Sequence, residues 1–177
     1  MKKILLFALC TVFVFAASAQ DEKVFVNDKN AQPRQVAGAF SAISVAGSID
    51  LYLSQSDEEV VVVSAAETKY RDRIVTEVIN GELKIYYNDK GLQWSSGSKN
   101  LKAYVSFKTM QKLTASGASD IYVQGVLKAD ALKIDISGSS DFKGAVDVNQ
   151  LSLDQSGSSD SHISGRTANL KIEVSGA

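Results

Sequence analysis

The stretch Leu132-Lys-Ile-Asp-Ile-Ser-Gly-Ser-Ser-Asp141 contains the pattern that organises this chain. Its first half alternates apolar and polar side chains, and its second half is a run of small residues around Gly138. Alternation with a period of two is typical of a β-strand that has one face on a core and the other in water. Glycine permits a positive φ, and serine and aspartate side chains accept hydrogen bonds from the backbone amides of a turn. The stretch therefore predicts a strand followed by a tight corner.

The same pattern recurs along the chain. The corner glycines Gly117, Gly138, Gly157 and Gly176 follow one another at steps of 21, 19 and 19 residues, and an earlier copy is centred on Gly47. A period this short holds two strands and a corner but leaves no room for a crossover helix. Coils that stack about 4.8 Å apart would pair their equivalent strands. From the residues alone we expect an all-β solenoid with Ser-Gly-Ser corners.

Residues 40–111 differ in sequence pattern from the repeats that follow them. Two short apolar segments flank Asn80-Gly81, a dipeptide that is typical of the type I′ turn of a β-hairpin. We therefore divide a predicted single domain into an N-terminal β sector, residues 40–111, and a repeat sector, residues 112–177.

The beginning of the chain has the features of a secretory signal peptide. Lys2 and Lys3 precede an apolar segment, residues 4–16, and the small residues Ala17-Ser-Ala19 follow it. The apolar segment is shorter than the roughly 20 residues that a transmembrane helix needs. We expect a signal peptide over residues 1–19 and a flexible extension over residues 20–39. The protein would then be exported to the periplasm, the outer-membrane surface or the medium, with no transmembrane span left in it.

The composition excludes several classes of function. The formal net charge is −1 and basic residues occur singly, so no nucleic-acid partner is expected. One histidine and one cysteine exclude zinc and iron sites that need two such ligands from this chain. His162 lies near a predicted corner and is interpreted as a variable outward residue. We expect no cofactor and no enzymatic activity.

These features together resemble the head GIN domain family of putative auto-transporter adhesins. The residues that carry the resemblance are Val45-Ala-Gly-Ser-Ile-Asp-Leu-Tyr-Leu53, the Asn-Gly hairpin and the Ser-Gly-Ser-Ser-Asp repeats, together with the leader. The resemblance implies a right-handed parallel β-helix-like solenoid and a role in adhesion. Because the sequence stops at Gly176-Ala177, inside a predicted corner, we expect further coils in the natural protein and self-association through an open C-terminal end.

The predicted function is that of an exported, adhesin-like interaction module that presents stacked polar rows to a glycan or a surface protein. A polysaccharide-active enzyme on the same fold and an envelope-assembly or stress-sensing protein stay open as alternatives. Trp94, with Tyr86 and Tyr87, is a candidate aromatic platform for sugar rings, although aromatic side chains in strands usually fill cores. The candidate ligand-binding residues are Trp94, Lys133, Asp135, Lys171 and Glu173.

Aspartates that lie three residues after the corner glycines form a further pattern. Gly-x-x-Asp at a regular period is similar to calcium-binding β-rolls, which makes Asp120, Asp141 and Asp160 candidate calcium ligands, with Asp50 in the earlier copy. The period is about 19 residues and not the roughly nine of those proteins, and a second ligand is missing. The favoured interpretation is that these carboxylates cap the corners, so no metal site is predicted.

Overall fold

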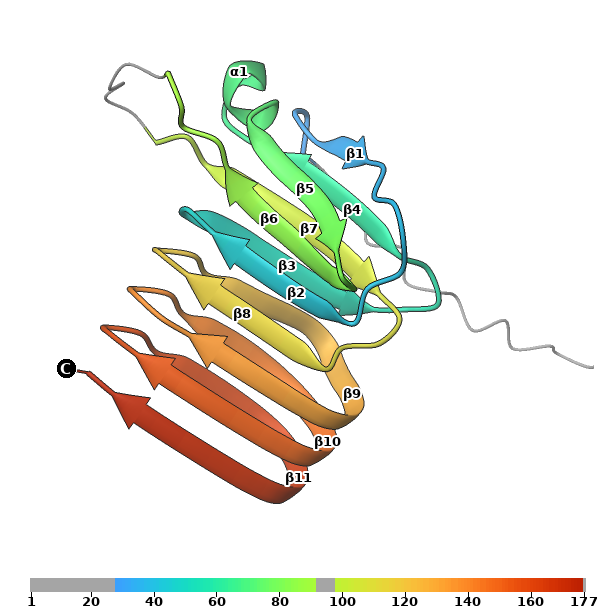
Figure 1. Ribbon diagram of the computed structural model, residues 1–177, viewed down its shortest axis with the longest axis vertical. Helices are drawn as coiled ribbons and strands as arrows, with labels where there is room; N and C mark the ends of the chain where they lie inside the picture. Colours follow the sequence, from blue (N-terminus) through green and yellow to red (C-terminus); the bar gives the residue numbers. More distant parts are fainter. Residues whose placement is uncertain (1–27, 92–97, 177) are drawn as a thin grey trace, which may run out of the picture.

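The computed structural model describes residues 28–91 and 98–176. Eleven strands form one sheet, and the single short helix of this part of the chain, α1 (Thr68–Arg71), follows β4 (Figure 1). The strands are β1 (Gln32–Arg34), β2 (Ala42–Ala46), β3 (Ile49–Gln55), β4 (Val60–Ser64), β5 (Ile74–Ile79), β6 (Glu82–Tyr87), β7 (Leu101–Phe107), β8 (Lys112–Ser116), β9 (Ile121–Ile136), β10 (Phe142–Ser156) and β11 (Ser161–Ser175).

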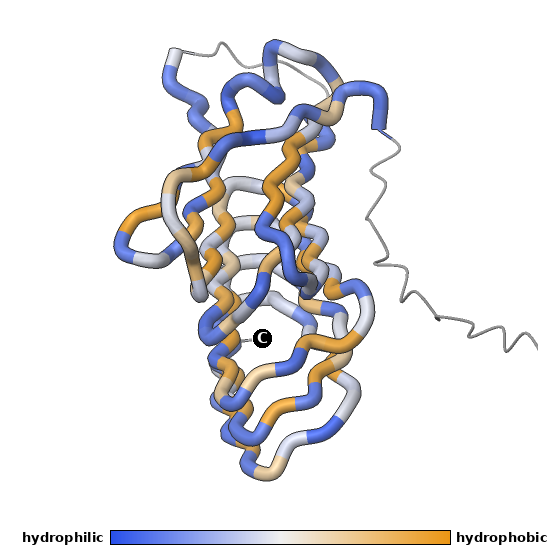
Figure 2. The backbone as a smooth tube through the Cα atoms, turned by 90° about the vertical axis from the view of Figure 1, so that its right-hand side faces the viewer, coloured by the Kyte–Doolittle hydropathy of each residue, from blue (hydrophilic) through white to orange (hydrophobic). Residues whose placement is uncertain are grey.

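The sheet folds back on itself into two facing walls, because β9 bends and contributes to both (Figure 2). The first half of β9 pairs with β3, where Ile121 lies beside Leu51, and its second half pairs with β8, where Ile134 lies beside Leu113. The first wall contains β1, β4, β7, β3 and the start of β9, and the second wall contains the end of β9, β8, β2, β6 and β5. β10 and β11 follow β9 around the same bend in parallel register.

Pairing at both ends of the strand order is antiparallel, between β1 and β4 and between β4 and β7 at one end, and between β5 and β6 at the other. The expected right-handed parallel β-helix-like solenoid is therefore wrong: the fold is all-β, but it is a mixed, nearly closed, barrel-like sheet. The repeat period says nothing about how strands outside the repeats pair. There, Asn80 and Gly81 have φ values of 53° and 77°, the backbone of a tight hairpin turn, and this turn places β5 antiparallel to β6.

The core lies between the two walls and is built from alternate residues of each strand. On the second wall, Ile43, Leu113 and Ile134 lie in register on neighbouring strands, and each is at most 1% exposed. On the first wall, Ile121 and Phe142 are paired and fully buried. Each such side chain contributes about 1.5–3 kcal/mol to stability when it leaves water. The alternation of apolar and polar residues thus aligns into a continuous apolar interior.

A row of buried serines joins successive corners. Ser119, Ser140 and Ser159 each lie two residues after a corner glycine, and each is at most 7% exposed. The Ser140 hydroxyl accepts a hydrogen bond from the Ser119 N–H at 3.1 Å, and the Ser159 hydroxyl accepts one from the Ser140 N–H at 3.2 Å. The Ser119 hydroxyl accepts from the Ile49 N–H at 3.2 Å. The repeated serine therefore satisfies a backbone donor of the preceding corner that would otherwise be buried without a partner.

The serine row leads to a stability prediction. We expect Ser140→Ala to lower the free energy of unfolding by about 1–3 kcal/mol, because the buried Ser119 N–H loses its acceptor. Urea unfolding followed by circular dichroism measures the change. Ser139→Ala is the matched control, since Ser139 is the exposed neighbour in the same corner. Equal midpoints for the two variants would contradict the role given to Ser140.

Candidate functional site

A groove of about 620 Å³ lies at the bend where β9, β10 and β11 pass between the two walls. Apolar side chains of Leu151 and Leu170 and amide groups of Gln150 and Asn169 are part of its lining. Leu170 is 57% exposed, whereas Leu151, its neighbour on β10, is 5% exposed. The groove therefore offers both apolar surface and hydrogen-bonding groups to a ligand.

Positive charge dominates the groove. Lys128, Lys133 and Lys171 line it, and Asp130 is the one carboxylate among the described lining residues. Asp130 is engaged already, because the Asn149 side-chain amide donates a hydrogen bond to its Oδ1 at 2.7 Å. All three lysines are exposed to solvent, and the side chains of Lys133 and Lys171 are 48% and 67% exposed. This arrangement favours an anionic ligand.

Four of the predicted site residues lie at this groove or beside it. Lys133 Nζ lies 2.8 Å from Asp135 Oδ1 on β9, and Lys171 Nζ lies 2.8 Å from Glu173 Oε1 on β11. The hydrogen bond that Lys133 donates to Asp135 raises the pKa of Lys133, and the hydrogen bond that Glu173 accepts from Lys171 lowers the pKa of Glu173. Asp135 also lies 3.4 Å from the Lys112 ammonium. The two lysines line the groove, and the two carboxylates pair with them from outside its lining.

The remaining predicted residues lie elsewhere. Trp94 falls outside the residues that the structure describes. Tyr86 is exposed and its hydroxyl donates to Glu77 Oε1 at 3.1 Å, whereas the Tyr87 ring contacts the Lys99 ammonium, 4.8 Å from the ring centroid. Consecutive residues of a strand point to opposite faces, so these two tyrosines do not form one platform.

The corner aspartates act as parts of the corners. Asp141 Oδ1 accepts a hydrogen bond from the Asp160 N–H at 3.0 Å, and the Asp141 carbonyl accepts one from the Ile121 N–H at 2.8 Å. Asp120 Oδ2 lies 3.4 Å from the Tyr122 hydroxyl, which donates to it. Within residues 28–91 and 98–176, no group of three or more His, Cys, Asp or Glu side chains is placed to hold a metal ion. These contacts support the favoured interpretation of corner capping, and the calcium alternative for these aspartates stays an untested prediction.

A row of stacked tyrosines on the first wall was missed by the sequence analysis. The ring of Tyr52 stacks on Tyr104 and on Tyr122, with centroids 5.0 and 5.2 Å apart and interplanar angles of 18° and 16°. Burial raises the pKa of all three phenols. Part of the signal was present, because a tyrosine follows the aspartate by two residues in both Asp50-Leu-Tyr52 and Asp120-Ile-Tyr122. Tyr104 carries no such signal and joins the row only through the pairing of β3 with β7.

Asp50 lies beside this row and gives a pH-dependent prediction. Burial, followed by the charge of Asp120, raises the pKa of Asp50, so the folded state favours its protonated form. A carboxyl group with a raised folded pKa destabilises the protein once the pH is above its ordinary range of about 4. We expect Asp50→Asn to raise the melting temperature at pH 7 and to leave it unchanged near pH 3 (about one unit below that range), where both states are protonated. The exposed Asp57→Asn is the control, and a fall in stability at pH 7 would contradict the sign.

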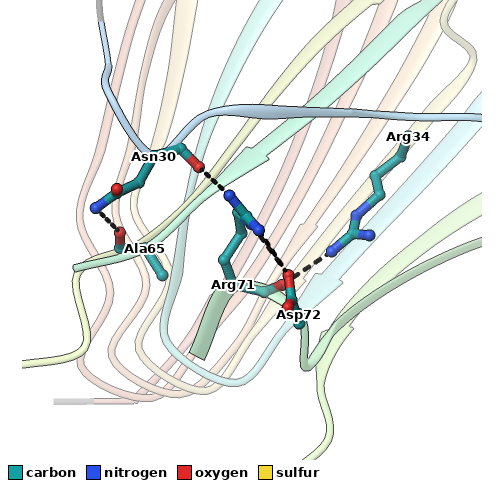
Figure 3. Close-up of polar contacts among 5 residues, drawn as sticks. All are labelled: Asn30, Arg34, Ala65, Arg71 and Asp72. Atoms are coloured by element: carbon teal, nitrogen blue, oxygen red, sulfur yellow. Dashed lines mark hydrogen bonds and ion pairs between the residues drawn. The ribbon is translucent and has the colours of Figure 1, made fainter. Parts of the chain in front are cut away.

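A dense polar cluster lies at the other end of the molecule and brings two arginines together (Figure 3). Arg34 donates to the Arg71 carbonyl at 3.0 Å, and Arg71 donates to the Asn30 carbonyl at 3.2 Å and to Asp72 Oδ1 at 2.9 Å. Asn30 in turn donates to the Ala65 carbonyl at 3.0 Å. Backbone carbonyls accept most of these hydrogen bonds, so the cluster connects the segment around β1 to α1.

Comparison with known proteins identifies the family. Residues 39–177 match the family described as "Putative auto-transporter adhesin, head GIN domain". The chain belongs to this family. The predicted resemblance is thereby confirmed, and the family description accords with an adhesin-like protein that is exported or held at a cell surface. A comparison with curated proteins gave no match. No helix of the described head GIN domain is long and apolar enough to span a membrane.

Solved structures share the fold of this head GIN domain. One, described as a putative lipid binding protein from Parabacteroides distasonis, has 20% identity and a TM-score of 0.59 over 85% of this chain and 72% of that chain. A putative adhesin from Parabacteroides merdae has 15% identity and a TM-score of 0.55 over 84% and 79% of the two chains. A putative adhesin from Parabacteroides distasonis has 16% identity and a TM-score of 0.53 over 83% and 78%. Identities this low show the fold alone.

Proposed function

We propose that this head GIN domain is an exported, non-enzymatic, adhesin-like module that binds an acidic glycan in the groove at the bend of β9, β10 and β11. The observation that carries the proposal is the set of three lysines around a groove with a single carboxylate among its described lining residues. Exposed ammonium groups bind carboxylate and sulfate groups through charge-assisted hydrogen bonds. The amides of Gln150 and Asn169 in the same groove suit sugar hydroxyls.

The spacing of the lysines supports a polymeric ligand. Lys133 is on β9 and Lys171 is on β11, with β10 between them. Neighbouring strands lie about 4.8 Å apart, so the two positions are separated by roughly 10 Å along the stack of strands. A chain of sugars that carries repeated acidic groups can contact both lysines. The Lys171–Glu173 pair is exposed on both sides and is a weak competitor, because pairs of this kind contribute about 0–1 kcal/mol. Asp135 is 23% exposed and divides its charge between Lys133 and Lys112.

The same geometry argues against the alternative of a polysaccharide-active enzyme. Hydrolysis of a glycosidic bond ordinarily uses two carboxyl groups on either side of the bond. Of the described residues that line the groove, Asp130 alone has a carboxyl group, and it is hydrogen-bonded to Asn149. Export is supported by the predicted leader, residues 1–19, which lies outside the described residues, and by the family description.

A glycan array that includes acidic and neutral polysaccharides tests the proposal. We expect the chain to bind acidic glycans and the double variant Lys128→Ser/Lys133→Ser to bind them at least tenfold more weakly. Lys143→Ser is the matched control, because Lys143 is an exposed lysine of β10 that lies away from the groove. Equal binding by all variants, or preference for neutral glycans, would overturn the assignment of the groove. A parallel assay for turnover of polygalacturonate would detect the enzymatic alternative.

A further inference from the structure

Asp135 contacts two lysines at once. Lys133 Nζ lies 2.8 Å from its Oδ1 and 3.1 Å from its Oδ2, and Lys112 Nζ lies 3.4 Å from its Oδ2. The side chain of Asp135 is 23% exposed, whereas those of Lys112 and Lys133 are 45% and 48% exposed. Water solvates an exposed ammonium group but reaches a covered carboxylate poorly, so Asp135 depends on a cationic partner more than either lysine depends on Asp135.

The two lysines differ in their relation to the groove. Lys133 lines it, whereas Lys112 is not among its described lining residues. They are in-register neighbours on β9 and β8, in the interior of the sheet, where β8 also pairs with β2 and β9 with β10. Like charges on neighbouring strands repel each other. A movement of Lys133 into the groove therefore relieves this repulsion and leaves Lys112 beside Asp135.

The Thr114 hydroxyl is a further reserve partner for Asp135. Thr114 is the in-register neighbour of Asp135 on β8, and both side chains point outward from the same wall. Thr114 Oγ1 is buried and has no hydrogen-bond partner among the described residues. A buried hydroxyl without a partner is unfavourable, so this group gains when it donates to a carboxylate. Asp135 thus has two groups at hand to replace Lys133.

We propose that Asp135 and Lys112 position Lys133 for the ligand by an exchange of partners. Before the ligand binds, Asp135 holds Lys133 at the border of the groove. When Lys133 turns to an anionic group in the groove, Lys112 becomes the ion-pair partner of Asp135. This inference rests on the proposed function, because it takes the groove as the ligand site. Asp135 therefore limits the affinity, and Lys112 lowers the cost of releasing Lys133.

A nuclear magnetic resonance experiment without a ligand tests the exchange. Lys133→Ser imitates the state in which Lys133 has left Asp135. We expect the ammonium group of Lys112 to become more ordered in this variant, measured by nitrogen relaxation, because it becomes the main partner of the carboxylate. The double variant Lys133→Ser/Asp135→Asn is expected to lose this gain. Lys84, which pairs with Glu82 on β6, is the control whose order stays unchanged.

Binding of an oligogalacturonate and of a heparin oligosaccharide, measured by calorimetry, tests the effect on affinity. We expect Asp135→Asn to bind about fivefold more tightly than the native chain, because Lys133 is then free of its ion pair. Asp154→Asn is the matched control, since exposed Asp154 is the neighbour of Asp135 on β10. It removes the same charge without releasing Lys133, so its effect is expected to stay below about twofold.

Lys112 supplies the second half of the binding test. We expect Lys112→Ser to weaken binding about fivefold, because Asp135 then depends on Lys133. Lys112→Arg is expected to restore native affinity, since arginine also pairs with a carboxylate. In the Asp135→Asn background, Lys112→Ser is expected to have less than half of its effect on the binding free energy, because no carboxylate remains to be shared. Circular dichroism verifies that every variant is folded.

The outcomes separate this inference from the proposed function. Equal gains from Asp135→Asn and Asp154→Asn, or equal losses from Lys112→Ser in both backgrounds, would overturn the exchange and indicate a general effect of charge. An ammonium group of Lys112 that is as mobile in Lys133→Ser as in the native chain would overturn it without any ligand. If the native chain binds neither probe, the proposed function fails, and the order of Lys112 alone decides whether the exchange of partners occurs.

Discussion

Gly138→Val is expected to unfold the part of the sheet formed by β9, β10 and β11. Gly138 has a φ of +85°, which valine strongly disfavours, and a Cβ built there would lie 2.4 Å from the Gly117 carbonyl oxygen. The obstructing atom is backbone of the adjacent corner, so it can move only if the corners separate. We expect a loss of about 4 kcal/mol or more, measured as the free energy of unfolding in urea and as the melting temperature by circular dichroism.

Gly125 is the matched control for Gly138, because a variant there distinguishes the effect of backbone strain from the effect of the collision between corners. Gly125 has a φ of +75°, and a Cβ there would meet nothing within 4 Å. Gly125→Val therefore carries the strain of a positive φ without the collision, and we expect a loss of about 1–3 kcal/mol. If Gly138→Val were no more destabilising than Gly125→Val, the contact between successive corners would not require glycine.

Phe142→Ala is expected to have the second largest effect. Phe142 is fully buried at the start of β10, between Ile121 of β9 and Ser161 of β11. Removing its ring leaves a cavity between the walls that neighbouring strands cannot fill without breaking their ladders, and buried phenylalanines replaced by alanine cost about 3–5 kcal/mol. Urea unfolding measures the loss, with the exposed neighbour Lys143→Ala as the control. A loss below about 1 kcal/mol would show that the two walls are not packed against this side chain.

Much of the local structure could be predicted from residue patterns. Alternation in Leu132–Ile136 places Ile134 inside and Lys133 outside, as the structure does, because a strand has a period of two. The steps of 19 and 21 residues between corner glycines set the parallel register of β9, β10 and β11, in which Asp135, Asp154 and Glu173 lie side by side. These features can be predicted because each depends on residues close together in sequence or on equivalent positions of successive repeats, which pair with each other.

Pairing partners outside the repeats could not be predicted in the same way. Alternation assigns each side chain to a face but does not say which strand lies beside it or in which direction. This is why the antiparallel pairs of β4 with β1 and β7 overturned the expected solenoid. The stack of Tyr52 on Tyr104 and the contact of Arg34 with Arg71 depend on such long-range pairs and were missed for the same reason.

The candidate site depends partly on the sequence repeat and partly on the tertiary structure. Lys133 and Lys171 were identified from the sequence because the repeat places them on the outer face of the same wall. That they border a groove, with Lys128 and Asn169 from the bend, was decided by the tertiary structure alone. The sequence by itself determined the strands, their corners and the faces of their side chains, since these follow from local sterics and burial. The tertiary structure decided the direction of pairing, the bend and the groove, because these depend on contacts between segments that no local pattern relates.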